Sequence, residues 1–442
     1  MATADLYSRI EEAQDIVDLA AALLSFCRRH EMDYRRADNH ESSRAAEASL
    51  SRQAAEWFQG RSEELDTENR HKVLQALREP SEIPLVVRAR AIAVGLDRAL
   101  GRRFYGVFRG VGVRPLEPNS PVLVRRPPLK EILGSLNAPP ERLDPRVDRL
   151  PNLRLAPAEL YGFEIDLDFS LQDAAGPICD REHQVFVTCH PNASLAELVC
   201  HEDGNTPPDS FFWFQPKDAK RQDRIVRALL QKAAEAGAGV VLFPELCLEA
   251  EAAQRWLDEL ESPPSPVRLL VAGSHHVEVG GRRRNQALAL LRGSRKVLRH
   301  WKNFRYVDKK LGREDIYEDT PGFTVYFSGG WSFAIVICKD FLVERVRQML
   351  EALAVNLVLI PSLTGSATPF EGFVPLLTQT HQAFVMMANS PAEESGVHAI
   401  FSYPAKREAS YSVPAGGLGA PGICVHRPGR SWSWIDLEEI FD

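Results

Sequence analysis

Hydrophobic residues recur at helical spacing over the first hundred residues. Apolar side chains between Ile10 and Leu24 repeat every three or four positions, and similar patterns run near 43–58 and 84–100. No glycine precedes Gly60, which also favours helices. We therefore predict an α-helical N-terminal domain over residues 1–108.

The composition changes after residue 108. Ten prolines stand between positions 110 and 157. Proline fixes φ and removes a backbone donor, so such a segment favours extended chain over long helices or central strands. We therefore predict a proline-rich linker or extension over residues 109–180.

Strand and helix patterns alternate from residue 211 onward. Amphipathic helices are predicted at 218–236 and 343–353, and residues 184–188 are compatible with a strand. Short apolar runs predict further strands at 211–214, 239–243, 269–272, 287–291, 333–337, 357–360 and 383–388. This alternation is typical of an α/β fold in which helices cover strands, and we assign residues 181–442 to it.

The composition of the chain excludes several classes of protein. No apolar run reaches the roughly 18–20 residues that span a bilayer, and the N-terminus lacks the basic and apolar order of a signal peptide. The seven cysteines are scattered, which suits reduced thiols. We therefore expect a cytoplasmic protein without membrane contact. The net charge of -7 makes nucleic acid an unlikely partner, because phosphate binding needs an excess of Lys and Arg.

Three polar residues stand at the ends of predicted strands or hairpins. Cys338 follows the apolar run 333–337, where rigid backbone can hold a nucleophile at a sheet edge. Glu245 follows the run 239–243, where partial desolvation makes a carboxylate a better base. Lys302 could lower the pKa of a nearby thiol and steady an oxyanion. Taken singly, the ordinary alternatives are a buried structural cysteine, a carboxylate at a helix start and a surface lysine.

Together these residues resemble the nitrilase, or carbon–nitrogen hydrolase, superfamily. The chain reads Phe-Pro-Glu-Leu around Glu245, His-Trp-Lys-Asn around Lys302 and Val-Ile-Cys-Lys-Asp around Cys338. The resemblance covers about residues 211–390, with the run 211–214 as its first strand. It extends to the flanking segments Val271-Ala272-Gly273-Ser274, Asn285-Gln286-Ala287, Pro321-Gly322 and Ala388-Asn389.

The resemblance implies a fold and a reaction. The fold is a four-layer α-β-β-α sandwich, here preceded by the helical domain, and the family often dimerises, so we expect a homo-oligomer. Cys338 would attack a small-molecule amide or nitrile and form a thioester, with Glu245 as the base. Lys302 and the backbone N–H of Lys339 would stabilise the oxyanion. No metal or organic cofactor is expected, and the triad does not separate amidase from nitrilase, carbamoylase or acyltransferase.

Two positions near the predicted site are open to interpretation. The family has a second glutamate between its lysine and cysteine, and Glu314 is our first choice, with Glu318 as the alternative. Lys339 stands where the family prefers an aromatic residue. Its side chain would either favour an acidic substrate or point into solvent.

A group of cysteines and histidines offers a zinc alternative. Its members are Cys179, His183, Cys189, His190, Cys200 and His201. Zinc sites normally use tight cysteine pairs, whereas these spacings are irregular. We therefore expect no metal site.

The long helical region supports a second hypothesis of another class. The nitrilase-like domain would be a sensor or effector module, and the N-terminal helices would bind a protein partner. Such an architecture would suit a bacterial antiviral defence system. The two hypotheses are compatible if catalysis is the output of the module.

Overall fold

The computed structural model describes most of the chain. The described residues are 3–59, 65–100, 113–115, 123–125, 150, 153–155, 162–171, 178, 184–261, 265–319, 321–328, 331–404 and 410–437. Within these ranges, no helix combines the length and the apolar character that crossing a bilayer requires.

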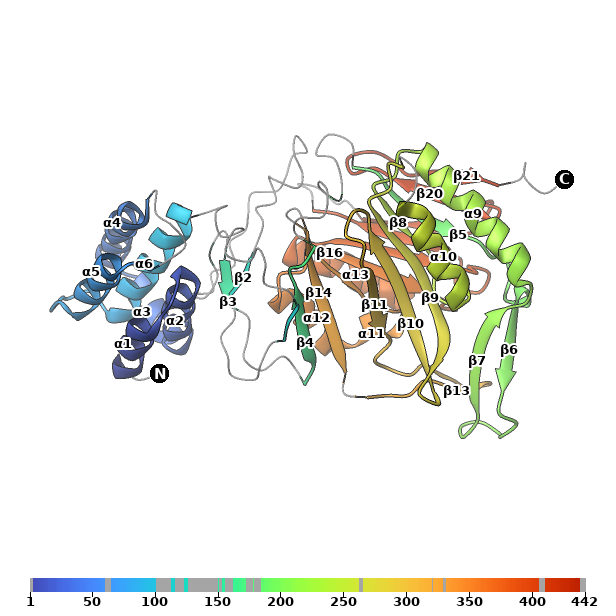
Figure 1. Cartoon of the computed structure of the whole chain (residues 1–442), viewed down its shortest axis with the longest axis horizontal. Helices are drawn as coiled ribbons and strands as arrows, with labels where there is room; N and C mark the ends of the chain where they lie inside the picture. Colours follow the sequence, from blue (N-terminus) through green and yellow to red (C-terminus); the bar gives the residue numbers. More distant parts are fainter. Residues whose placement is uncertain are drawn as a thin grey trace.

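The described part of the first hundred residues folds into helices, which Figure 1 shows grouped at one end of the molecule. They are α1 (Thr3–Glu12), α2 (Ile16–Arg29), α3 (Glu31–Asp38), α4 (Glu41–Phe58), α5 (Thr67–Arg78) and α6 (Leu85–Leu100). Two of the predicted helical stretches correspond to α4 and α6. Gly95 allows these two helices to approach closely, because a Cβ at this position would lie 2.5 Å from the carbonyl oxygen of Ser51.

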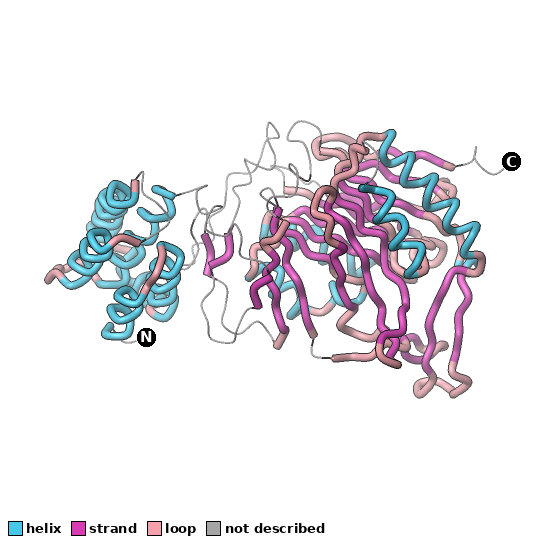
Figure 2. The backbone as a smooth tube through the Cα atoms, viewed as in Figure 1, coloured by secondary structure: helices cyan, strands magenta, loops and turns pink. Residues whose placement is uncertain are grey.

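Two large sheets form the centre of the remaining chain (Figure 2). The eight-stranded sheet has the order β1 (Val113–Pro115), β4 (Glu164–Asp168), β14 (Gly322–Ser328), β15 (Trp331–Ile335), β16 (Leu357–Ser362), β17 (Phe384–Asn389), β18 (Val397–Ser402) and β19 (Ser410–Pro414). The seven-stranded sheet has the order β11 (Val297–Trp301), β10 (Arg282–Leu291), β9 (Leu269–Val279), β8 (Val240–Leu242), β5 (Phe186–His190), β20 (Gly422–His426) and β21 (Ser433–Asp436). The fold is therefore mixed α/β, as the sequence predicts.

The alternation of side chains along β8 shows how the layers are held. Val240 and Leu242 belong to the apolar core shared with the eight-stranded sheet, whereas Val241 belongs to the core beneath α9 and α10. Helices α9 (Ala219–Glu235) and α10 (Ala250–Glu261) thus cover the seven-stranded sheet. On the other sheet, α13 (Thr368–His381) packs against β17 and β18, and it also contacts α11 (Lys339–Leu342) and α12 (Glu344–Ala352).

Two small sheets lie outside this core. One contains β12 (Val307–Asp308), β13 (Gly312–Glu314), β7 (Phe211–Pro216) and β6 (Leu198–Glu202), and the 3-10 helix η2 (Leu195–Glu197) precedes it. The other pairs β2 (Leu123–Arg125) with β3 (Leu153–Leu155). Figure 1 shows β6 and β7 as a hairpin that projects away from the large sheets.

The structure corrects two of our predictions about strand placement. The run 211–214 is not the first strand of a large sheet but part of the projecting hairpin, and only Phe212 among its four residues is buried. The strand next to β8 is β5, which is buried along its whole length. The predicted linker over 109–180 also supplies β4 to the eight-stranded sheet, because Ile165 and Leu167 alternate into the core.

Candidate active site

Four of the residues singled out from the sequence converge at the ends of strands. Glu245 follows β8, Lys302 follows β11, Cys338 follows β15 and Glu314 ends β13. All four side chains are buried, although each of them carries or can carry a charge. Since buried charges are unfavourable unless they are paired, the contacts among these groups decide whether the arrangement is stable.

Cys338 occupies a strained turn between β15 and α11. Its φ of 46° lies in the left-handed region that non-glycine residues rarely adopt. Hydrogen bonds enforce this conformation, because the N–H of Cys338 donates to Pro361 (2.9 Å) and its carbonyl accepts from the N–H of Phe341 (3.0 Å). Strain of this kind costs roughly 1–3 kcal/mol and is concentrated at functional sites.

The thiol of Cys338 has polar neighbours on the adjacent strand. The hydroxyl of Ser362 donates to Sγ at 3.3 Å, and Sγ lies 3.8 Å from the carbonyl oxygen of Leu363. Burial and the nearby Glu245 raise the pKa of the thiol to about 12, although Lys302 and the Ser362 hydroxyl act in the opposite direction. The thiol is therefore protonated at neutral pH, and it needs a base to become a nucleophile.

Lys302 joins the two carboxylates. Its ammonium Nζ donates to Oε1 of Glu245 at 2.8 Å and to Oε2 of Glu314 at 2.6 Å. Its backbone N–H donates to the carbonyl of Asn285 at 2.9 Å, which holds the residue beside β10. Burial alone would lower the pKa of Lys302, but the two carboxylates outweigh it and raise the pKa well above its usual value. The lysine is therefore a permanent cation.

The carboxylate of Glu314 is saturated with donors. Oε1 accepts from Asn285 Nδ2 (2.9 Å) and lies 3.2 Å from His276 Nε2. Oε2 accepts from Lys302 Nζ (2.6 Å) and from the N–H of Tyr306 (3.1 Å). Burial alone would raise the pKa of Glu314, but Lys302 and His276 hold it far below its ordinary value. A carboxylate bound in this way is a fixed negative charge and a poor proton acceptor.

Glu245 is held less completely. Its Oε1 accepts from Lys302 and from Asn285 Nδ2, both at 2.8 Å, and its Oε2 accepts from the N–H of Leu363 at 3.0 Å. The contacts among the described residues leave one acceptor direction on Oε2. Because Leu363 also lies against the thiol of Cys338, this oxygen is on the side of the nucleophile.

Asp340 ties the turn after Cys338 to the segment after Lys302. Its carboxylate accepts from the N–H groups of Asn303 (2.8 Å) and Phe304 (2.9 Å). Burial raises the pKa of Asp340 to about 7, and these donors limit the shift. The contacts fix the positions of the cysteine and the lysine relative to each other.

Two other sequence candidates do not join this cluster through their side chains. Glu318, the alternative second glutamate, has a side chain that is 46% exposed, and it accepts from the N–H of Arg305 at 3.0 Å. Lys339 donates its Nζ to the carbonyl of Arg305 at 2.7 Å, so this ammonium is held by the loop. Of the two glutamates weighed from the sequence, Glu314 is therefore the one that reaches Lys302.

Sequence reasoning missed the polar residues that complete the cluster. Asn285 and His276 are direct partners across the β9–β10 pair, and both contact Glu314. The signal for Asn285 was present, because it stands between three arginines and a buried apolar run. Without the strand register, however, that signal could not show which face of the sheet the side chain occupies.

The described members of the cysteine and histidine group do not gather into a cluster that could hold a metal ion. Cys179 and His183 lie outside the described residues. Within the described part of the chain, no group of three or more His, Cys, Asp or Glu residues could hold a metal ion.

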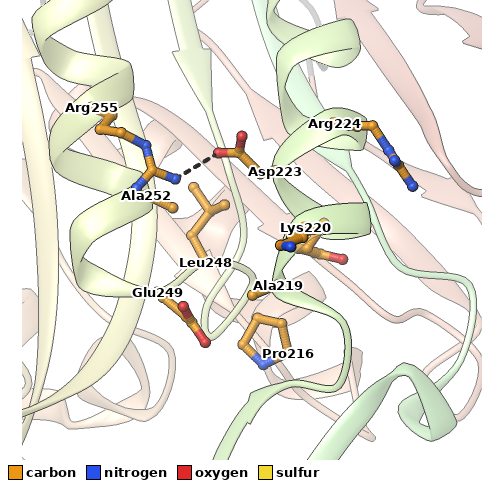
Figure 3. A pocket seen from close by; sticks show the side chains of 10 residues that line it. Pro216, Ala219, Lys220, Asp223, Arg224, Leu248, Glu249, Ala252 and Arg255 are labelled. Carbon is orange, nitrogen blue, oxygen red and sulfur yellow. Dashed lines mark hydrogen bonds and ion pairs between the residues drawn. The ribbon is translucent and has the colours of Figure 1, made fainter.

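One cavity borders the site, and a second cavity lies apart from it between two helices. One of about 710 Å³ borders Lys302 and Asn303 and has Arg284, Glu164 and Asp166 on its walls. The other, of about 320 Å³, lies between α9 and α10, where Arg255 pairs with Asp223 at 3.3 Å (Figure 3). The second cavity contains none of the converging residues and belongs to the outer helical layer.

Comparisons with known proteins give structural likenesses only. No protein-family model and no curated protein sequence matches the chain. Among solved structures, an amidase from Nesterenkonia sp. is 18% identical over 56% of this chain and 90% of that one, with a TM-score of 0.41. A mutant of an amidase from Nesterenkonia sp. AN1, which carries the acetamide moiety of fluoroacetamide on its active-site cysteine, has the same identity and TM-score and covers 56% of this chain and 91% of that one. A further mutant, described as from the nitrilase superfamily, is 18% identical over 55% of this chain and 89% of that one, with a TM-score of 0.38. Solved structures similar to this chain are thus nitrilase-superfamily amidases, at a distance that leaves its function to be argued from the site itself.

Proposed function

We propose that this protein hydrolyses non-peptide carbon–nitrogen bonds of a small amide or nitrile through a thioester on Cys338. The observation that carries the proposal is a strained, buried cysteine at a strand end beside a lysine held between two buried carboxylates. An inert structural cysteine requires neither the strain nor the charges. In this proposal the chain folds as a four-layer α-β-β-α sandwich behind a helical domain.

Acylation begins at the thiol. The free side of Glu245 Oε2 takes the proton from Sγ, and the thiolate attacks the amide carbon to form a C–S bond. The negative charge that develops on the substrate oxygen is stabilised by Lys302 Nζ. It is also stabilised by the N–H of Lys339, which opens α11 and so has no acceptor within the helix. Donors placed in this way contribute roughly 3–4 kcal/mol each to transition-state stabilisation.

The amine leaves when Glu245 returns the proton to its nitrogen and the C–N bond breaks. Glu245, now ionised again, removes a proton from a water molecule that attacks the thioester carbon. The C–S bond then breaks, the acid leaves and the thiol recovers its proton. For an amide, one water is consumed and one amine and one acid are formed; a nitrile consumes a second water on the way to the acid and ammonia.

The two carboxylates divide this work. Oε2 of Glu245 has one donor and keeps an acceptor direction toward the thiol, whereas each oxygen of Glu314 has two hydrogen-bond partners. Glu314 therefore serves as a fixed charge that holds Lys302 and helps to orient the substrate. Because the surroundings of the two carboxylates differ, one of them can act as a base while the other stays ionised.

The test is a panel of short aliphatic amides and nitriles, with release of ammonia as the readout. Wild type should turn over at least one member, and Cys338→Ala should abolish that turnover without lowering the unfolding temperature. Cys200→Ala is the matched control, since Cys200 lies in the projecting hairpin. If Cys338→Ala retains the activity of the wild type, the proposed mechanism is wrong.

A second candidate role concerns the helical N-terminal region. A groove of about 600 Å³ runs between α4 and α5, with Trp57, Gln53 and Ile83 among its lining residues. A groove of this kind on a helical unit favours recognition of a protein partner, which the hydrolytic chemistry does not require. Capture experiments with residues 1–108 present and deleted would test it, because binding should be lost with the helices.

A further inference from the structure

A histidine on β9 links the projecting β6–β7 hairpin to the candidate active site. His276 stands on β9, and its side chain is only 3% exposed. We propose that His276 is a positioning residue that ties this hairpin to Glu314, so that the hairpin is a structural part of the catalytic site. The inference rests on the proposed function and assigns a role to an element that this function leaves unexplained.

The imidazole of His276 bridges the two parts directly. Nε2 lies 3.2 Å from Oε1 of Glu314, and Nδ1 lies 3.3 Å from the backbone nitrogen and 3.2 Å from the carbonyl oxygen of Phe214. A carboxylate can only accept, so Nε2 must carry a proton. In the neutral ring Nδ1 then accepts from the Phe214 N–H, and in the charged ring it donates to the Phe214 carbonyl. Either form links β7 to Glu314.

The backbone around Glu314 is attached to the same hairpin. Strand β13 pairs in parallel with β7, with Glu314 opposite Phe212. The N–H of Arg313 donates to Ser210 at 2.9 Å, and the N–H of Asp315 donates to Phe212 at 2.7 Å. The hairpin therefore fixes both the main chain and the side chain of the second glutamate.

An aromatic and ionic contact closes the same interface. The guanidinium of Arg283 lies 3.7 Å from the ring centroid of Trp213 and also pairs with the carboxylate of Asp315. His201 lies on β6, the other strand of the hairpin, and its ring stacks on that of Trp213 with the two centroids 4.9 Å apart. This second histidine gives no hydrogen bond to Glu314, which makes it a matched control for His276.

The consequence for catalysis follows from the donors on Glu314. Without His276, Oε1 of Glu314 would keep Asn285 as its donor. The Glu314 carboxylate could then rotate out of the position in which it accepts the hydrogen bond from Lys302. The ammonium would then shift toward Glu245 and away from the developing oxyanion. Displacements of about 1 Å at a catalytic group can cost on the order of 100-fold in rate, whereas binding of the substrate needs no such accuracy.

The experiment uses the full chain and p-nitrophenyl acetate as an acylating probe. The burst of nitrophenolate reports acylation of Cys338, and the steady state reports deacylation. We would compare His276→Gln, His276→Asn and His276→Phe with His201→Phe, and measure the unfolding temperature of each. Gln places its amide near the position of Nε2 and can reach Glu314, whereas Asn places its amide near Nδ1 and can reach Phe214 but not the carboxylate.

We expect the maximal burst rate to fall roughly 10- to 100-fold in the Asn and Phe variants, with the half-saturating probe concentration unchanged. The Gln variant should recover most of the rate, and His201→Phe should match the wild type. Equal burst rates for Gln and Asn, at equal unfolding temperatures, would overturn the positioning role while leaving the proposed function intact. A wild type whose burst does not depend on Cys338 would overturn the proposed function and this inference together. If the Phe variant does not fold, the comparison of Gln with Asn still decides.

Discussion

Replacing Lys302 with Met removes the ammonium that donates to both buried carboxylates while keeping a side chain of similar length. The two hydrogen bonds that this change removes are 2.8 Å and 2.6 Å long, and all three side chains are at most 3% exposed. Glu245 and Glu314 would then share a buried region with two negative charges and no bridging cation. Removing one partner of a buried ion pair typically costs about 3–5 kcal/mol of unfolding free energy. We expect Lys302→Met to fall in this range at pH 7.

The destabilisation should shrink as the pH falls. In the wild type the pKa of Glu314 lies below its unfolded value, so its contribution to stability is present above pH 4.5 and decreases as the solution is acidified. In the Lys302→Met variant the nearby negative charge of Glu245 raises the pKa of Glu314, so that protonation of Glu314 stabilises the folded state. This second effect brings the variant closer to the wild type at pH 5 than at pH 7, whereas the wild type loses the contribution of Glu314 only below about pH 4.5.

A double-mutant cycle with Glu314→Gln isolates the interaction. The Gln removes one negative charge, so it should cost less in the Lys302→Met background than in the wild type, with a coupling of about 1–3 kcal/mol. Urea unfolding at pH 7 and pH 5 measures all four proteins. Lys232→Met serves as the control, because Lys232 pairs with Glu235 at 3.5 Å on the surface and such a pair contributes only about 0–1 kcal/mol. Additive effects within about 0.5 kcal/mol would refute the account of a lysine held between two carboxylates.

Three further predictions concern the surroundings of the site. Gly273→Ala should lower the unfolding free energy by at least roughly 1–3 kcal/mol, because Gly273 has a φ of +73° and a Cβ there would lie 2.1 Å from the carbonyl oxygen of Pro244. Thermal unfolding measures this loss, and an unchanged unfolding midpoint would contradict the prediction. As the pH rises from 5 to 8, the unfolding free energy of Asp340→Asn should increase relative to that of the wild type, by at most about 1.4 kcal/mol per pH unit. The reason is that burial raises the pKa of Asp340 to about 7, so the folded wild type resists losing that proton. If urea unfolding gives a constant difference between the two free energies across this range, the prediction is refuted. Ser362→Ala should slow alkylation of Cys338 by roughly tenfold or more, because it removes the hydrogen bond from the Ser362 hydroxyl to the thiolate. A hydrogen bond to a charged group contributes about 1.5–3 kcal/mol. Equal alkylation rates in the two proteins would show that the hydroxyl does not stabilise the thiolate.

The convergence of the central residues was predictable because each of them follows a segment that the sequence identifies as a strand or hairpin. The apolar runs before Glu245 and Cys338 are short, β-branched and bounded by polar residues, and they form β8 and β15. Such runs identify strands by composition alone. The resemblance to known motifs then placed Lys302 beside them, although the sequence could not supply the distances.

The remaining features depend on pairings between distant segments. Whether Glu314 or Glu318 reaches the lysine is decided by the parallel pairing of β13 with β7, about a hundred positions earlier in the chain. The same pairing explains why the run 211–214 was misplaced. An aromatic run reads as a core strand, and its composition cannot reveal that it joins a hairpin outside the large sheets. The role of His276 was hidden for the same reason, since the partners of its side chain lie on two other strands, β7 and β13, that are distant in the sequence.

The most direct test of the central claim is a brief exposure to iodoacetamide at pH 7, followed by intact-protein mass spectrometry and peptide mapping. Accessibility alone favours Cys200, which is partly exposed, over Cys338, which is 6% exposed. Activation predicts the opposite: Cys338 labels first, the fast adduct is lost in Cys338→Ala, and Glu245→Gln slows it at least roughly 100-fold. If Cys200 labels first and Glu245→Gln leaves the rate at Cys338 unchanged, the cysteine is a structural residue and the proposed hydrolase mechanism is wrong.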